Sequence, residues 1–328
     1  MRSKKINPIS YLEWPAKIII AAAALWFIYK RIFVKGNIHE LLDAYIPLFH
    51  ETTSQRLIII VVLLMIANWS LEAWKWKLMI AKIEHISFIR SLEAVFSGLT
   101  VSFFTPNRTG EFAGRVFQLQ KADRIKASII TIIENNSQLI ITILTGSIAL
   151  TFYLSTYAEM NIYWFAASTL FSLTIGAMAV FFFLKISVLE TFFERFTPLR
   201  KFHPYLEIFS YYSAKELLQV LSLALLRYVV FTTQFYLLLE LFGASIPLLP
   251  ALIMITMIFY VMTLVPTFFV TELAVRGSVA IAFLSVLTGN ETAIINSTVS
   301  LWLVNIAVPS LIGSISVLTF HFRKDNNN

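Results

Sequence analysis

The sequence predicts an all-α polytopic membrane protein, and three observations lead to this fold class. First, 58% of the 328 residues are hydrophobic and only 14% are charged, with a mean hydropathy of +0.75. Second, apolar runs long enough to cross a bilayer recur along the chain. Third, basic residues gather between alternate runs, as they do in cytoplasmic loops. A soluble domain does not need this apolar excess, so we treat residues 1–328 as a single integral membrane domain.

Six segments have the length of about 20 mostly apolar residues that a full span requires. They are Ala16–Val34, Arg56–Ile80, Ser128–Leu154, Tyr163–Leu184, Leu217–Phe242 and Ala293–Phe320. The first run follows basic residues, as the apolar part of a signal peptide does. It is long for a signal peptide and no cleavage site of small residues follows it, so we predict a span there.

Two further apolar stretches are interrupted by proline, which removes a backbone hydrogen bond and breaks a helix. They are Phe88–Phe104, closed by Pro106, and Ala251–Val265, closed by Pro266. A second helical piece is predicted after each, at about Glu111–Gln120 and Glu272–Leu287. At membrane depth, this pattern is typical of re-entrant hairpins or broken helices.

The two interrupted segments share a motif that predicts an internal repeat. After its proline, each carries Glu-(Phe/Leu)-Ala-x-Arg, once at Glu111–Arg115 and once at Glu272–Arg276. Glu and Arg four positions apart lie on one helix face, where they can pair. The predicted topology brings the hairpins in from opposite sides, so halves at about 56–155 and 217–320 are expected to be inverted. The alternative is chance recurrence in a chain rich in Phe, Leu and Ala.

Loops with and without Lys and Arg alternate, and this pattern predicts the orientation. Basic residues fill Lys75–Arg90, Lys121–Lys126, Lys185–Lys215 and Arg323-Lys324. The connections at 157–162, 243–247 and 289–291 contain none. We therefore predict cytoplasmic N- and C-termini and, at 185–215, an amphipathic loop on the inner membrane surface. Only Lys30, Arg31 and Lys35 argue against this orientation.

Charges in the first interrupted segment are candidates for substrate binding, because a charge at the bilayer centre costs about 2.5–3.5 kcal/mol. Thr109 stands where a helix N-cap is expected, and a helix N-terminus suits a phosphate. Arg115 adds planar donors that match phosphate, and Arg108 reinforces them. We expect both arginines to bind phosphate and Glu111 to orient them.

In the second interrupted segment, Thr271 stands at the expected N-cap, and Glu272 with Arg276 is expected to form an opposing gate. The alternative for both Glu–Arg pairs is a static brace. Other polar residues within spans supply secondary candidates: Glu72, Glu134, Gln138 and Arg227. Glu72 also has Lys75 within reach, which either pairs with it or extends to the inner surface. For Gln138, Gln234 and Asn305, polar contacts between helices are the more frequent explanation.

Other chemistry finds little support in the sequence. Without cysteine there is no thiolate metal site, and the five histidines lack metal-ligand spacing, so we predict no metal and no cofactor. The net charge of +7 suits anionic lipid headgroups, whereas a nucleic-acid partner is not expected. Gly110 and Gly114 form a lone GxxxG motif, which we interpret as close packing beside a hairpin.

Several stretches resemble the transmembrane region of the lysylphosphatidylglycerol synthase/flippase family. They are Asn68-Trp69-x-x-Glu72-x-x-Lys75-Trp76, Ser102–Arg115 with its Pro-x-x-x-Gly-Glu core, Pro266–Gly277 and Leu301–Asn305. Together they cover about residues 56–320. The second motif departs from the family pattern, because Phe268, Phe269 and Val270 stand where glycines are expected. Two-part family members add a cytosolic aminoacyltransferase domain, and we expect this chain to be a stand-alone member without one.

This resemblance implies translocation of anionic or aminoacylated phospholipid, or of a related lipid-linked substrate, across the cytoplasmic membrane of a bacterium. No ATP-binding motif is visible, so transport is expected to be downhill, proton-coupled or driven by a partner. A separate lipid-modifying enzyme and a second copy of the chain are the partners we consider. One alternative is an integral membrane enzyme that acts on lipid phosphates with Glu111 as base, although no catalytic motif supports it. The other is a non-transporting scaffold of a lipid-modifying complex.

Overall fold

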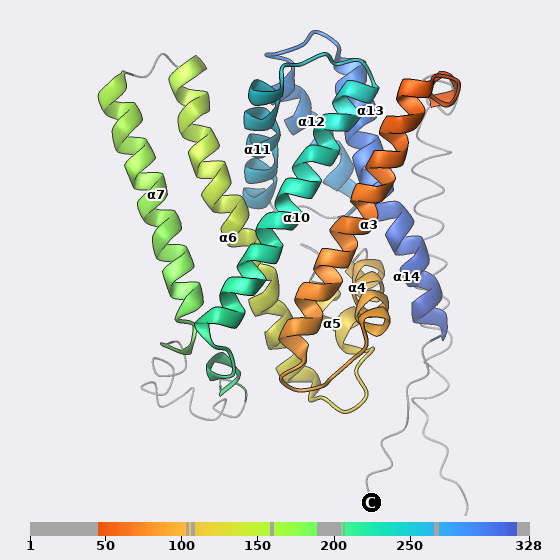
Figure 1. Ribbon diagram of the computed structural model, residues 1–328, viewed down its shortest axis with the longest axis vertical. Helices are drawn as coiled ribbons and strands as arrows, with labels where there is room; N and C mark the ends of the chain where they lie inside the picture. Colours follow the sequence, from red (N-terminus) through yellow and green to blue (C-terminus); the bar gives the residue numbers. More distant parts are fainter. Residues whose placement is uncertain are drawn as a thin grey trace, which may run out of the picture.

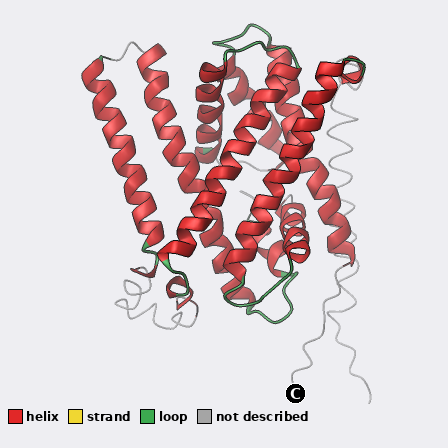
Figure 2. Ribbon diagram, viewed as in Figure 1, coloured by secondary structure: helices red, strands yellow, loops and turns green. Residues whose placement is uncertain are grey.

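The computed structural model describes residues 45–102, 105, 109–157, 161–188, 205, 207–265 and 269–319. In that part of the chain every regular element is a helix (Figures 1 and 2). Five helices there are long and apolar enough to cross a membrane. The predicted all-α polytopic membrane fold is therefore confirmed. The expected first span, Ala16–Val34, lies outside the described residues, as do Arg108, Pro106 and Pro266.

Each of the five long helices coincides with a predicted span. They are α3 (Thr52–Ile80), α6 (Arg124–Tyr157), α7 (Ile162–Leu184), α10 (Ala214–Leu241) and a last helix composed of α13 (Glu291–Trp302), η6 (Leu303–Ala307) and α14 (Val308–Thr319). Side-chain capping explains where two of these helices begin. The Asn161 side chain accepts hydrogen bonds from the first amides of α7, and Ser213 forms a capping box with Glu216 at α10.

Two pairs of shorter helices stand where the interrupted segments were predicted. They are α4 (Phe88–Ser102) with α5 (Gly110–Val116), and α11 (Leu248–Leu264) with α12 (Phe269–Leu284). At about 1.5 Å per residue, even the 17-residue α11 is near 25 Å long, less than the roughly 30 Å apolar thickness of a bilayer. The helices of each pair pack against one another, and the pairs lie at opposite ends of the bundle (Figure 1). Whether they are re-entrant stays a prediction.

The order of elements repeats along the chain. A long helix, a short pair and a long helix occur as α3, α4–α5 and α6, and again as α10, α11–α12 and the last helix. Among the α-helices of the described residues, α7 alone stands outside this scheme. The order agrees with the predicted halves and Figure 1 places the short pairs at opposite ends, while the two-fold relation itself stays a prediction.

Two local predictions about the short helices are wrong. Helix α5 ends at Val116, not near Gln120, because the backbone passes into turns in which Gln118 N donates to Arg115 O at 3.2 Å. Helix α12 begins at Phe269, so Thr271 lies inside the helix and not before it.

The core of the bundle is formed where α3 and α10 cross, with α6, α11 and α13 packed around them. Helix α14 packs closely against α4, where Thr100 Oγ1 donates to the carbonyl of Ser310 at 2.8 Å. Helix α7 packs mainly on α6 and leaves most of its apolar surface exposed, as a helix facing lipid does.

The basic connections α3–α4 and α5–α6, and the described ends of the connection from α7 to α10, lie at one end of the bundle, the lower end in Figure 1. The connections α10–α11 and α12–α13 lie at the other end. Lys82 and Glu216 form an ion pair of 2.6 Å at the basic end. The alternation of basic and non-basic connections therefore corresponds to the two ends of the bundle. Most of the predicted amphipathic loop at 185–215 lies outside the described residues.

Candidate functional site

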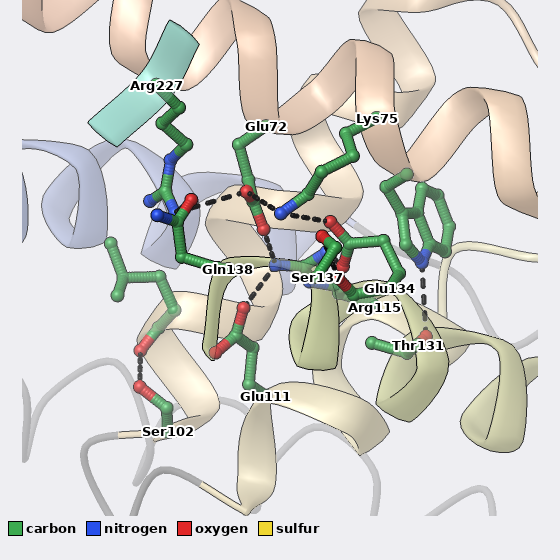
Figure 3. Close-up of polar contacts among 12 residues, drawn as sticks. Glu72, Lys75, Ser102, Glu111, Arg115, Thr131, Glu134, Ser137, Gln138 and Arg227 are labelled. Atoms are coloured by element: carbon green, nitrogen blue, oxygen red, sulfur yellow. Dashed lines mark hydrogen bonds and ion pairs between the residues drawn. The ribbon is translucent and has the colours of Figure 1, made fainter. Parts of the chain in front are cut away.

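A network of ion pairs lies inside the bundle, which we call the buried ionic cluster (Figure 3). Its members come from four helices: Glu72 and Lys75 of α3, Glu111 and Arg115 of α5, Glu134 of α6 and Arg227 of α10. Three carboxylates face three cations, so the formal charges cancel. Burying any one of them unpaired would cost several kcal/mol, so the set forms as a unit.

Arg115 lies at the centre of the buried ionic cluster and is fully buried. Its Nη2 lies 2.5 Å from Glu72 Oε1 and also pairs with Glu111, while Nη1 lies 3.0 Å from Glu134 Oε2. The predicted pairing of Glu111 with Arg115 is therefore confirmed. Because three carboxylates already hold this guanidinium, the arrangement corresponds to the brace interpretation of the first motif.

Lys75 shows why a cation can remain at this depth. Its Nζ lies 3.0 Å from Glu72 Oε2 and 2.7 Å from Glu134 Oε1, and only 1% of the side chain is exposed. The expected pairing with Glu72 is confirmed. The alternative, in which Lys75 extends to the membrane surface, is wrong, because two carboxylates compensate the charge inside the bundle.

A cavity of about 700 Å³ adjoins the buried ionic cluster. Its polar lining comes from six elements: Asn68 of α3, Gln138 and Thr142 of α6, Arg227 of α10, Thr263 of α11, Glu272 and Arg276 of α12, and Asn305 of η6. Trp69, Tyr228, Phe231 and Phe259 supply the aromatic wall. Asn68, Gln138 and Arg227 stand near the middle of their long helices, so the cavity lies at half the depth of the spans. The volume falls in the range of about 300–1,000 Å³ that is usual for ligand sites.

Arg227 belongs to both the buried ionic cluster and the cavity. Its Nη1 lies 3.3 Å from Glu72 Oε2 and 3.4 Å from Gln138 Oε1, and its guanidinium carbon lies 5.6 Å from the centre of the Trp69 ring. Arg227 Nε is buried and has no hydrogen-bond partner among the described residues. Arg227 therefore pairs with a Glu of another helix and also lines the cavity, and one of its N–H donors is left without a partner among the described residues.

The second Glu–Arg pair also forms, and it borders the cavity. Arg276 Nη2 donates to Glu272 Oε1 at 2.8 Å, and both residues line the cavity. Arg276 Nε is buried without a hydrogen-bond partner within the described ranges. The two copies of the motif therefore differ in surroundings: Arg115 has three carboxylate partners, whereas within the described residues Arg276 pairs with Glu272 of its own helix.

Three carboxamides on α3, α10 and η6 form a hydrogen-bonded chain beside the cavity, which we call the amide relay. Asn68 Nδ2 donates to Asn305 Oδ1 at 3.2 Å, and Asn305 Nδ2 donates to Gln234 Oε1 at 2.8 Å. Gln234 Nε2 in turn donates to the backbone carbonyl of Val61 at 2.9 Å. The predicted polar contacts between helices are confirmed for Gln234 and Asn305.

Asn305 reaches this position from a widened turn of the last helix. The π-helix η6 ends two residues before Pro309, which has no N–H to donate to the carbonyl four residues earlier, that of Asn305. A wider turn accommodates this missing bond, and such turns are frequent at functional sites.

The structure thus divides the predicted site residues into two groups. Glu111, Arg115, Glu72 and Glu134 lie in the buried ionic cluster and are not among the residues that line the cavity, while Arg227, Gln138, Glu272 and Arg276 line it. Arg108 lies outside the described residues. The predicted cap is also corrected: the Thr109 side chain makes no cap hydrogen bond, and Gly110 N donates to Thr105 Oγ1 at 2.6 Å instead.

Aromatic residues of the cavity were missed by the sequence interpretation. Trp69 and Tyr228 directly follow Asn68 and Arg227 in the sequence, and their position beside intramembrane polar residues is a signal that could have identified them. Phe259 stands in a uniformly apolar helix, where no local signal distinguishes it.

The fold and this site define a polytopic α-helical membrane protein with a charged cavity at the middle of its spans. A comparison with protein families matches residues 14–313 to the Lysylphosphatidylglycerol synthase TM region. The chain therefore belongs to this family, whose membership indicates a lipid-related role in a membrane. Searches of curated proteins and of solved structures gave no significant match.

Proposed function

We propose that this protein moves an anionic phospholipid, or a related anionic lipid-linked substrate, between the two leaflets of the cytoplasmic membrane. The headgroup phosphate would occupy the cavity. The observation that carries this proposal is a set of three buried N–H groups without partners among the described residues, all on residues that line the cavity: Trp69 Nε1, Arg227 Nε and Arg276 Nε. A buried donor without an acceptor costs about 1–3 kcal/mol, and a phosphate oxygen would remove that cost.

The charged residues that line the cavity include more cations than carboxylates. Arg227 and Arg276 contribute +2 and Glu272 contributes −1, which leaves +1 among the described lining residues. Arginine also suits phosphate better than lysine does, because the planar guanidinium presents paired donors. Arg227 is also one of the three cations that balance the carboxylates of the buried ionic cluster, so the cluster and the lining taken together are neutral. The preference for an anion therefore depends on the unpaired guanidinium N–H donors and not on a net charge.

A route for the headgroup follows from the exposure of the lining. Leu264, at the C-terminal end of α11, lines the cavity and is 62% exposed, so the cavity reaches the bundle surface there. A lipid could keep its acyl chains in the surrounding bilayer while its headgroup crosses through the cavity. We place the end with the basic connections in the cytoplasm.

The enzyme alternative has less support. It requires Glu111 to act as a base, but Glu111 pairs with Arg115 and is not among the residues that line the cavity. Its carboxylate is therefore occupied by a cation rather than directed at a substrate space.

The decisive experiment is leaflet exchange of fluorescent phosphatidylglycerol in proteoliposomes. Wild type is compared with Arg227→Lys, Arg276→Lys and Trp69→Phe, each of which keeps charge or ring but removes a donor. We expect exchange by wild type and a loss of roughly tenfold in each arginine variant, equal to one well-made hydrogen bond to a charged group. Arg124→Lys is the matched control, since Arg124 is exposed at the end of α6.

Each outcome of this experiment has a clear meaning. If wild type moves no lipid, the translocation proposal is wrong. If wild type moves lipid and the arginine variants keep full activity, the cavity is not the headgroup site. Mass spectrometry of the lipids after the assay tests the enzyme alternative, which predicts a chemically changed product.

A further inference from the structure

The amide relay has only one consistent direction, because it ends at a backbone carbonyl. The carbonyl of Val61 can only accept, so Gln234 must direct its NH₂ group to it and its oxygen to Asn305. Asn305 must then direct its NH₂ group to Gln234, where the carbonyl of Leu301 also accepts from it at 3.1 Å. The Asn305 oxygen therefore faces Asn68, and Asn68 must donate to it.

Because the amide relay runs in this direction, one of its acceptors, Asn68 Oδ1, has no donor and lies at the cavity. Asn68 is 1% exposed and lines the cavity, and its Oδ1 has no hydrogen-bond partner among the described residues. A half-turn of the Asn68 carboxamide would exchange its NH₂ group and its oxygen. Two acceptors, Asn68 Oδ1 and Asn305 Oδ1, would then face each other. The cavity thus presents a fixed acceptor beside the three unpaired N–H donors of Trp69, Arg227 and Arg276.

We propose that Asn68 is a specificity-determining residue whose Oδ1 accepts a hydrogen bond from a hydroxyl group of the lipid headgroup. The cavity then selects an anionic phosphodiester whose headgroup carries a hydroxyl group. The N–H donors bind the phosphate, and Asn68 Oδ1 accepts the hydrogen bond from the hydroxyl. This inference rests on the proposed function. A site built to bond a hydroxyl rejects an analogue that lacks it, because the buried acceptor would be left unpaired.

A neutral hydroxyl fits this acceptor better than an ammonium group does. The described ionisable residues of the lining sum to +1, and Glu272 is already paired with Arg276 at 2.8 Å. A cationic headgroup would therefore meet two guanidinium groups and no free carboxylate in the described lining. A hydroxyl donates one hydrogen bond without adding charge.

The test compares two fluorescent lipids of equal charge and similar size in wild-type proteoliposomes: phosphatidylglycerol and phosphatidylpropanol, whose headgroup lacks hydroxyl groups. We expect phosphatidylglycerol to exchange roughly tenfold faster, the effect of one buried hydrogen bond. Equal rates would overturn the role of Asn68 and leave translocation intact. If neither lipid moves, the proposed function fails as well.

A variant then links this preference to Asn68. In Asn68→Ala the ratio of the phosphatidylglycerol rate to the phosphatidylpropanol rate is expected to fall from roughly ten to about one, a change of ratio that a general loss of folding would not produce. Thr298→Val is the matched control, because the Thr298 hydroxyl is buried and bonded to the carbonyl of Ile294, and Thr298 is not among the residues that line the cavity. A preference that survives in Asn68→Ala would contradict the assignment.

Phosphatidylethanolamine supplies the third arm of the test, since its ammonium group also donates hydrogen bonds. We expect it to exchange no faster than phosphatidylpropanol. If phosphatidylethanolamine exchanges as fast as phosphatidylglycerol and this rate depends on Asn68, the residue accepts a hydrogen bond from any donor. That result would overturn the selection for a hydroxyl.

Discussion

Arg227 of α10 lies 3.3 Å from Glu72 of α3, and this contact joins the cavity to the buried ionic cluster. The same guanidinium lines the cavity and keeps an unpaired Nε there. Glu72 does not depend on Arg227 alone, because Lys75 and Arg115 lie at 3.0 and 2.5 Å from it. Arg227 is thus the member of the cluster best placed to share its charge with a substrate.

The first prediction is that Arg115 and Arg227 contribute unequally to the free energy of unfolding. Arg115→Gln leaves Glu134 and Glu111 short of a cation in a buried environment, so we expect a loss of roughly 3–5 kcal/mol. Arg227→Gln should cost far less, because its side chain is 20% exposed and Glu72 keeps two cations. Thermal unfolding in detergent, followed by size-exclusion chromatography, measures the difference.

A compensated variant serves as the control for this prediction. Arg115→Gln combined with Glu134→Gln removes one charge of each sign, so it should recover part of the stability that Arg115→Gln alone loses. If the double variant is no more stable than the single one, lost packing and not charge balance explains the effect.

The second prediction concerns the close approach of α5 to α4. A Cβ atom added at Gly114 would lie 2.6 Å from Gly98 Cα and 2.7 Å from the carbonyl oxygen of Ser97. Both are backbone atoms that cannot rotate away, so Gly114→Ala should destabilise the protein by about 1–3 kcal/mol. This contact also confirms the close packing predicted for the GxxxG motif, in which α5 lies against α4.

Gly277 of α12 offers the matched control for Gly114. Apart from the backbone of α12 itself and the residues next to Gly277, no atom of the described residues lies within 4 Å of a Cβ added there. Gly277→Ala should therefore be neutral or stabilising by up to about 1 kcal/mol, because alanine favours the helix. Unfolding of both variants in the same detergent checks the pair, and equal losses would show that packing of α5 on α4 is not the cause.

The third prediction concerns pH at the end with the basic connections. Partial burial acts to raise the pKa of Glu84, but hydrogen bonds from the backbone amides of Lys121, Ala122 and Gln120 outweigh it and hold the pKa below the ordinary 4.5. A depressed folded-state pKa contributes stability that is present above the ordinary value and is lost as the pH falls through the folded value.

Comparison with Glu84→Gln isolates this contribution. At pH 7 the variant should be less stable by up to about 1 kcal/mol, since an amide accepts these hydrogen bonds less strongly than a carboxylate. The difference should shrink once the pH falls below 4.5. Melting curves from pH 7 to about pH 3.5 test this, and a difference that stays constant over the whole range would contradict the role of the carboxylate charge.

Several features of the protein follow from the sequence alone because they depend on local spacing. The five described spans follow from the length of their apolar runs, and the short helix pairs follow from prolines that interrupt two further runs. The pairing of Glu111 with Arg115, and of Glu272 with Arg276, follows from the helical repeat, which brings residues four positions apart together.

Only the tertiary structure decided which charges are enclosed and which border the cavity. The two motifs have the same sequence pattern but different surroundings. Arg115 is enclosed because α3 and α6 bring Glu72 and Glu134 to it, whereas Arg276 of α12 lines the cavity. These contacts join residues far apart in the chain, so they depend on how the helices cross. Local spacing contains no information on that crossing, because it is set by side-chain packing across the whole bundle.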